Sequence, residues 1–132
     1  MDYAALAEFR YALRKFLAFS EGAAAEAGLT SQQHQALLTI KALAGGRGPT
    51  VGMLAERLLV RQHSAVELVD RLARLDLVQR NPDPADRRRV LVALTPEGER
   101  KLQALSQAHL AELRAVGPAL AGVLSSLQVQ GR

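Results

Sequence analysis

Residues 77–98 read LVQRNPDPADRRRVLVALTPEG, and this stretch decides the predicted fold. Residues 77–80 and 89–94 are rich in branched side chains, which favour strands. Between them, residues 81–88 contain two prolines and several side chains that are common in turns. The two strands are therefore predicted to pair as a β-hairpin with a long loop, and the charged tip of that loop cannot be buried.

Two short amphipathic helices are predicted just before the hairpin. Thr50 can cap a helix that runs to about Leu58, and a second helix begins near Arg61 or Gln62. Two helices joined by so short a turn resemble a helix-turn-helix, and a helix-turn-helix followed by a β-hairpin is a winged helix. The residues expected on the buried sides are Val51, Leu54, Ala55 and Leu58 in the first helix, and Ala65, Leu68, Val69 and Leu72 in the second.

Longer helices are predicted on either side of this middle region. Residues 3–20 carry an apolar stripe at helical spacing. Another helix opens at Thr30, which forms a capping box with Gln33, and the segment 45–49, rich in glycine and ending in proline, stops it.

The last part of the chain is also predicted to be helical. Thr95 and Pro96 are an N-cap followed by proline at the first helical position. Gly117 and Pro118 are expected to break this helix, and a final helix is expected over residues 119–128. The apolar stripes of the terminal helices either pack on the core of the same chain, or on a second copy, or on both.

Composition limits the classes of protein that the chain can belong to. Its 132 residues suit one domain, and its hydrophobic content of 48% suits a buried core. The absence of cysteine excludes disulfides, thiolate zinc sites and cysteine redox sensors. No unbroken run of 18 apolar residues occurs, so no membrane span is expected, and the first residues do not resemble a secretory signal. A cytoplasmic location is expected.

The positive charge of the chain is concentrated in its middle. Residues 47–89 contain nine arginines and six acidic residues, whereas residues 1–46 contain four basic and four acidic residues. A local basic surface attracts polyanions, above all phosphate backbones. From charge alone, a surface that binds a polyanion and an ordinary solvated face are equally good interpretations.

Residues 50–95 resemble the MarR family, the regulators named for multiple antibiotic resistance. The matching text is LAERL at 54–58, LVDRL at 68–72, LV at 77–78, PDPADRR at 82–88 and LTPEG at 94–98. Each fragment is common, but the spaced set is specific. The resemblance implies a mainly helical winged helix-turn-helix over residues 31–95, flanked by dimerisation helices at 1–20 and 97–132 in a single domain.

The resemblance also implies a function. It implies a homodimer that binds a palindromic double-stranded operator, with the second helix of the helix-turn-helix in the major groove and the wing at the minor groove. It implies frequent control by small aromatic or phenolic ligands, and repression more often than activation. Leu59, Arg61 and Asp76 depart from the pattern, because the family usually has a turn glycine, a capping serine and a helix-ending glycine there.

The recognition helix has a physical basis of its own. Short and medium polar side chains at the start of such a helix can reach base edges, and its free N–H groups can bind a phosphate. Glu67 could accept from cytosine or could repel phosphate, and the sequence leaves both open. The residues expected to contact DNA from this helix are Arg61, Gln62, His63, Ser64, Glu67 and Arg71. The alternative is a solvated helix face.

The wing is expected to contribute a second set of contacts. By resemblance, Arg88 enters the minor groove and Asp86 holds it in place, and a narrow minor groove attracts arginine through its negative potential. Strand alternation should turn adjacent side chains of this set to opposite sides. The full wing set is Asp86, Arg87, Arg88 and Arg89. A solvent-exposed charge run is the alternative.

A cleft between the DNA-binding region and the terminal helices could bind an effector. Its expected lining is Phe9, Leu13, Phe16, His34 and Leu38. The three histidines, His34, His63 and His109, are too scattered in sequence to predict a metal site. No cofactor is predicted, and no catalytic triad, P-loop or GxGxxG motif supports an enzyme. The sequence leaves two rival functions open: a constitutive or architectural DNA binder without an effector, and a winged helix that binds a protein.

Overall fold

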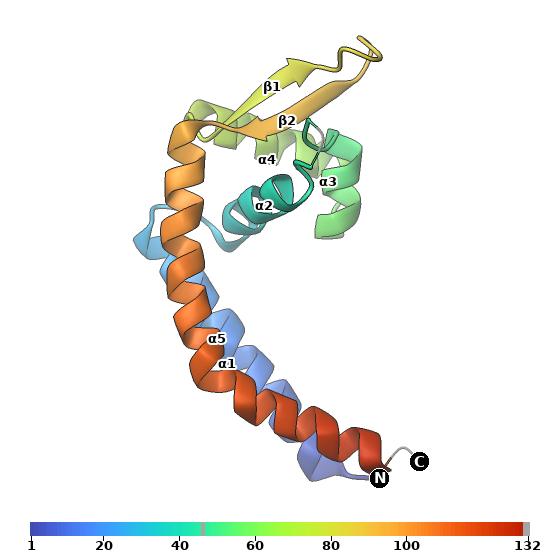
Figure 1. Ribbon diagram of the computed structural model, residues 1–132, viewed down its shortest axis with the longest axis vertical. Helices are drawn as coiled ribbons and strands as arrows, with labels where there is room; N and C mark the ends of the chain where they lie inside the picture. The colour runs from blue at the N-terminus through green and yellow to red at the C-terminus, as the bar shows by residue number, and fades with distance from the viewer. Residues whose placement is uncertain (46, 131–132) are drawn as a thin grey trace.

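The computed structural model describes residues 1–45 and 47–130, with side chains described as far as residue 127. Within these residues the elements are α1 (Tyr3–Glu26), α2 (Ser31–Ala42), α3 (Val51–Leu58), α4 (Gln62–Arg74), β1 (Val78–Pro82), β2 (Val90–Leu94) and α5 (Pro96–Gln130). Figure 1 shows a compact head, made of α2 to α4 and the hairpin, at one end of a long arm in which α1 and α5 lie side by side. The start of α1 and the end of α5 both lie at the far end of the arm (Figure 1).

The head is a winged helix, as predicted. β1 and β2 pair antiparallel from Val78 with Leu94 to Pro82 with Val90. Thr50 bridges to Leu91, so the segment before α3 lies along β2. The core beneath the hairpin is built from side chains of α2, α3, α4 and β2, the largest fully buried ones being Leu37, Ile40, Leu54, Val69, Leu72 and Val92. All four residues predicted on the inner face of α4 are buried.

Two predicted helix ends are wrong, and the first is the end of α1. The helix continues past residue 20 to Glu26, because Ala23, Ala24 and Ala25 are strong helix formers and Ala24 is fully buried. It then ends in a Schellman motif, in which Leu29 N–H donates to Ala24 O at 2.9 Å. The left-handed residue of that motif is Gly28, at φ 78°.

The predicted break at Gly117 and Pro118 is also wrong, since α5 runs through both residues. Proline removes one helical N–H and crowds the preceding turn, but exposed carbonyls there can be hydrated and the helix can curve. Pro118 is exposed, and Figure 1 shows α5 following a curved path. The hairpin strands are shifted by one or two residues from their predicted bounds, because pairing extends to Pro82 and the turn occupies residues 83–89.

Within the described part of the chain, α1, α3 and α4 each end near a left-handed residue, and the last two of these residues are not glycine. Leu59 has φ 57° and Asp76 has φ 59°. Val60 N–H donates to Ala55 O, and Leu77 N–H donates to Leu72 O, both at 3.0 Å. The turns after α3 and α4 therefore survive the departures at Leu59 and Asp76, at the energetic cost of a side chain in left-handed backbone.

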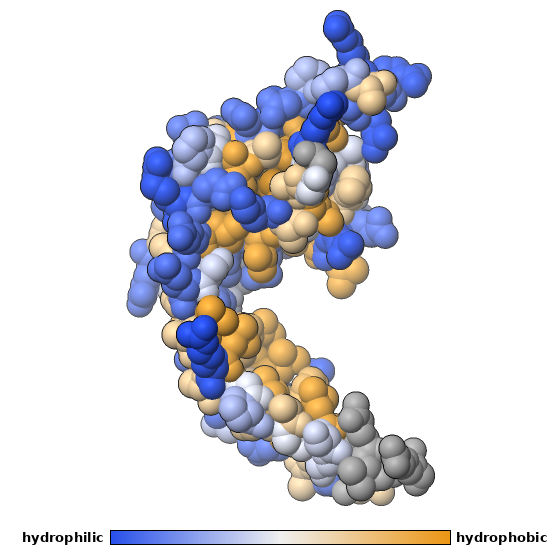
Figure 2. All heavy atoms as spheres, viewed as in Figure 1, coloured by the Kyte–Doolittle hydropathy of each residue, from blue (hydrophilic) through white to orange (hydrophobic). Residues whose placement is uncertain are grey.

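The arm exposes large apolar side chains along its length. They include Tyr3 at 76%, Leu17 at 55%, Leu110 at 48% and Leu124 at 46% exposure. Figure 2 shows apolar residues along the arm below the head. By length and composition alone, α5 over Pro96–Leu127 is long and apolar enough to cross a membrane. The sequence prediction of no membrane span rested on the lack of an unbroken apolar run, which this helix also lacks. Glu112 and Arg114 interrupt the run, and a helix that packs against another copy has the same composition.

Candidate nucleic-acid interface and ligand cleft

α4 presents a polar outer face that begins at its N-terminus. The helix is amphipathic because Ala65, Leu68, Val69 and Leu72 fall on its buried side, which leaves the other side to solvent. Of the six residues predicted to contact DNA from this helix, Ser64 is half-buried and the others are exposed: Arg61, Gln62, His63, Glu67 and Arg71. Arg61 occupies the N-cap without a side-chain capping bond, so its guanidinium is not committed to the helix end.

A groove joins the start of α4 to the wing. It has a volume of about 470 Å³ and brings Gln62 together with Arg88 and Arg89. The remaining lining residues are Thr50, Val51, Gly52, Val66, Arg80 and Val90. The other predicted DNA-contact residues, including Arg87 and His63, do not line this groove. Three arginines and no acidic residue line the groove, so it is a basic surface.

The wing tip is organised by Asp83 and Asp86. Asp83 accepts from Ala85 N–H at 2.9 Å, and Arg89 N–H donates to Asp86 O at 2.9 Å. Asp86 Oδ1 accepts from both the backbone N–H and the Nε–H of Arg88, each at 3.1 Å. The Arg88 side chain is still 91% exposed. The carboxylate therefore orients the guanidinium and leaves most of it open to a ligand.

The electrostatics of the pair agree with its geometry. Hydrogen bonds from Arg88 are the main reason why the pKa of Asp86 lies below its ordinary value. Arg87 and Arg88 belong to the turn and not to a strand, since β2 begins at Val90. The expected strand alternation therefore does not apply to them, and their directions are set by the turn.

One ion pair of this surface was not predicted from the sequence. Arg80 on β1 donates to Asp70 on α4, which ties the hairpin to α4. Neither residue carries a motif that would have revealed the contact, because the pair depends on how the hairpin packs over α4. Figure 2 shows polar residues covering this end of the head and the wing.

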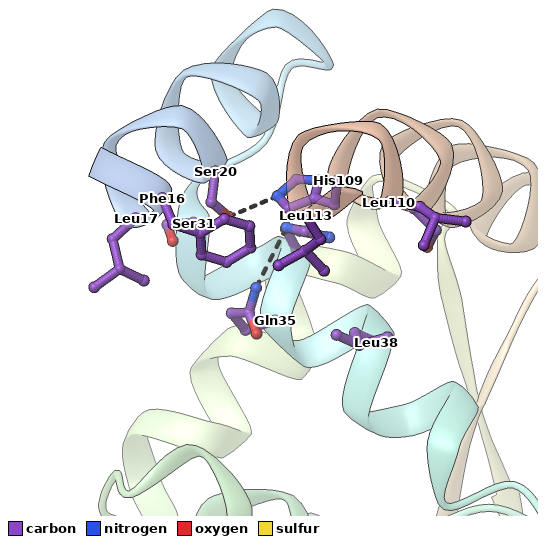
Figure 3. A pocket seen from close by; sticks show the side chains of 11 residues that line it. Phe16, Leu17, Ser20, Ser31, Gln35, Leu38, His109, Leu110 and Leu113 are labelled. Atoms are coloured by element: carbon purple, nitrogen blue, oxygen red, sulfur yellow. Dashed lines mark hydrogen bonds between the residues drawn. The ribbon is translucent and has the colours of Figure 1, made fainter. Parts of the chain in front are cut away.

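A second cavity, the ligand cleft, lies where the head meets the arm. It has a volume of about 450 Å³ between α1, α2 and α5. Its lining residues are Phe16, Leu17, Ser20, Ser31, His34, Gln35, Leu38, Ser106, His109, Leu110 and Leu113 (Figure 3). Phe16, His34 and Leu38 were expected there. Phe9 and Leu13 are not part of the lining. They precede Phe16 by about 10 and 5 Å along α1, on the side of its N-terminus.

Two histidines that are far apart in the sequence meet in this cleft. The rings of His34 and His109 have centroids 4.6 Å apart. His109 Nδ1–H donates to Leu105 O at 2.7 Å, which leaves Nε2 to accept from the Ser20 hydroxyl at 2.7 Å. Phe16 and Phe19 contact the His109 ring edge to face. The two histidines are distant in the sequence, and the packing of α2 on α5 brings them together.

Burial favours the neutral form of His34. The residue is 2% exposed, and burial first and the neighbouring His109 second lower its pKa below the ordinary value. Gln35 Nε2–H donates to His34 Nδ1 at 3.4 Å. Among the described residues, no group of three or more His, Cys, Asp or Glu side chains is arranged to hold a metal ion.

The fold and the basic groove define a winged-helix protein of the kind found in transcription regulators. Residues 27–89 match the sequence model of the MarR family. The chain is 43% identical over 54 residues to the uncharacterized HTH-type transcriptional regulator YsmB of Bacillus subtilis (strain 168). That match covers 41% of this chain and 37% of the length of YsmB.

Solved structures extend the similarity over the whole fold. CouR from Rhodococcus jostii RHA1, bound to p-coumaroyl-CoA, is 28% identical, with a TM-score of 0.71 over 89% of this chain and 79% of CouR. A point mutant of MepR from S. aureus, bound to an oligodeoxyribonucleotide, is 23% identical, with a TM-score of 0.69 over 96% of this chain and 99% of MepR. The chain therefore matches the MarR family in sequence over residues 27–89 and shares the fold of these structures over most of its length.

Proposed function

We propose that the protein is a homodimeric repressor that binds a palindromic duplex and releases it when a small molecule occupies the ligand cleft. In this proposal α4 reads the major groove through Gln62 and His63, and Arg88 enters the minor groove. The observation that carries the proposal is the groove that Gln62 shares with Arg88 and Arg89, with Asp86 orienting Arg88. Such a regulator acts in the cytoplasm, beside the chromosome.

The chemistry of the two DNA grooves supports assigning α4 to the major groove and the wing to the minor groove. The major groove shows a different donor and acceptor pattern for each base pair, which amide and imidazole groups can distinguish. The minor groove shows a degenerate pattern, but its negative potential attracts arginine. The MepR structure bound to an oligodeoxyribonucleotide supports DNA as the ligand in this proposal.

A dimer supplies the symmetry that a palindrome requires. The exposed apolar residues of α1 and α5, including Tyr3 and Leu124, support burial against a second copy. Two heads on a shared arm would then present two α4 helices at a fixed spacing. The cleft lies between the arm and each head, so a ligand there could change that spacing and hence DNA affinity.

Selection of bound duplexes from random DNA tests the proposal. The expected product is a palindrome with half-sites about one helical turn apart. Its affinity should fall on the order of 10³-fold between about 50 and 200 mM salt if about six phosphates are neutralised. Recovery of no enriched sequence would contradict sequence-specific binding. If small aromatic ligands leave duplex affinity unchanged, the protein is a constitutive DNA binder instead.

A further inference from the structure

We infer that the ligand cleft selects uncharged, mostly apolar molecules about the size of a two-ring aromatic and rejects carboxylates. The inference rests on the proposed function in one respect, because it assigns a ligand class to the same cleft. It goes beyond that function by stating which small molecules the residues of this chain can accept.

The size and walls of the cleft indicate an apolar ligand. A volume of about 450 Å³ falls within the range of small-molecule sites. Five of the lining residues are Phe or Leu, with at least one from each of the three helices: Phe16, Leu17, Leu38, Leu110 and Leu113. In Figure 3 the side chains of Phe16, His109 and Leu113 lie around the space between the helices. A flat aromatic molecule would bury its faces against such walls.

The charges of the cleft exclude an anion near neutral pH. In the part of the chain that the structure describes, the lining contains no Lys, Arg, Asp or Glu. The titratable groups that face the cleft are His34 from α2 and His109 from α5, and α1, which is described throughout, contributes none. A carboxylate that enters would lose its hydration without gaining a fixed counter-charge, which is costly.

The two histidines cannot easily provide that counter-charge. His34 is buried, and burial together with His109 keeps its pKa below the ordinary value. With the rings 4.6 Å apart, a charge on one disfavours a charge on the other. His109 is already engaged at both nitrogens, by Leu105 O and by the Ser20 hydroxyl.

Neutral polar groups remain to orient one hydroxyl or carbonyl of the ligand. Ser31, Gln35 and Ser106 line the cleft with groups that both donate and accept. Such groups hydrogen-bond an uncharged phenol without a desolvated charge. The expected ligand is therefore an aromatic body with one neutral hydrogen-bonding group.

Two matched probes test this selection on the full chain. 2-Naphthol and 2-naphthoate have the same ring system, and near pH 7.5 the phenol is uncharged, since phenolic pKa values lie near 10, whereas the carboxylate is ionised. Isothermal titration calorimetry should show that 2-naphthol binds at least about tenfold more tightly than 2-naphthoate.

A variant assigns the binding to this cleft. Leu38 lines the cleft and is 43% exposed, so Leu38→Trp should fill the cavity and abolish 2-naphthol binding without disturbing the core. Leu75, at the end of α4, is 49% exposed and does not line the cleft, so Leu75→Trp should bind 2-naphthol like the wild type.

Three results would overturn the inference: no binding of 2-naphthol by the folded wild type, equal or tighter binding of 2-naphthoate, or binding that Leu38→Trp leaves intact. The first would also be the outcome if a second copy filled the cleft. The calorimetry measures ligand binding without DNA, whereas the duplex selection tests the proposed function. The two can therefore fail independently. A protein that binds no selected duplex but prefers 2-naphthol would refute the regulator and keep the ligand class.

Discussion

Asp86 holds Arg88 through both its backbone and its side chain. One carboxylate oxygen of Asp86 lies 3.1 Å from the backbone nitrogen and 3.1 Å from Nε of Arg88. The contact holds one edge of the Arg88 guanidinium, while the side chain stays 91% exposed. An arginine positioned in advance loses less conformational freedom when it enters a groove.

This relationship predicts a graded effect of wing substitutions. Asp86→Ala should weaken duplex binding less than Arg88→Ala, because it removes only the orientation of the guanidinium. Fluorescence anisotropy with a labelled duplex measures both losses. Asp83→Ala is the control for the shape of the turn, since Asp83 bonds to Ala85 and not to Arg88. If Asp86→Ala had no effect, orientation by the carboxylate would be irrelevant to binding.

The apolar face of the arm predicts a dimer. Light scattering should give a mass of twice 14.2 kDa for the wild type. Leu124→Asp should shift the mass towards that of one protomer, because it places a charge in the proposed interface. The substitution should not disturb the protomer itself, since Leu124 is 46% exposed there. Leu75→Asp, at a similarly exposed position outside the arm, should remain dimeric. A monomeric wild type at micromolar concentration would contradict the dimer.

The turn after α3 predicts a stabilising substitution. Leu59 is 92% exposed and has φ 57°, so Leu59→Gly removes left-handed strain without losing buried surface. The free energy of unfolding in urea should rise by about 1 kcal/mol. Leu75→Gly is the matched control and should destabilise, because Leu75 has φ −81° and the glycine only adds freedom to the unfolded chain. Destabilisation by Leu59→Gly would show that the leucine makes contacts in the dimer.

The buried histidine predicts acid sensitivity. Because the pKa of His34 is lowered on folding from its ordinary value of 6.5, the unfolded chain binds more protons at this site below that pH. The neutral histidine therefore costs nothing above about pH 6.5, and the fold loses stability as the pH falls from there towards the folded pKa. Urea unfolding between about pH 8 and 5 should show a steeper loss for the wild type than for His34→Gln. His63→Gln, at an exposed position, should keep the wild-type slope.

Local patterns in the sequence predicted the head well, because its elements are set by caps and short-range periodicity. Thr30 with Gln33, and Thr50 before α3, form the caps that their spacing predicts. Gly28 was the local signal for the true end of α1, since its left-handed backbone closes the Schellman motif. Pro118 was misleading, since an exposed proline in a long helix can be accommodated by curvature.

The cleft could be predicted only in part, because its residues come from three helices whose packing has no local signature. Phe16, His34 and Leu38 follow from the apolar stripes and the expected junction of head and arm. His109 and Ser20 join the cleft only through the pairing of α1 with α5. For the same reason the contact of Arg80 with Asp70 could not be anticipated.

The central claim is that α4 reads sequence and the wing does not. The most direct test compares the affinities of wild type, Gln62→Ala, His63→Ala and Arg88→Ala for the selected duplex and for a random duplex, after circular dichroism confirms folding. Each α4 variant should lose about 1–3 kcal/mol on the selected duplex and much less on random DNA. Arg88→Ala should weaken both duplexes by similar factors. If Arg88→Ala leaves duplex affinity unchanged while the α4 variants weaken binding to both duplexes equally, the roles assigned to α4 and the wing are wrong.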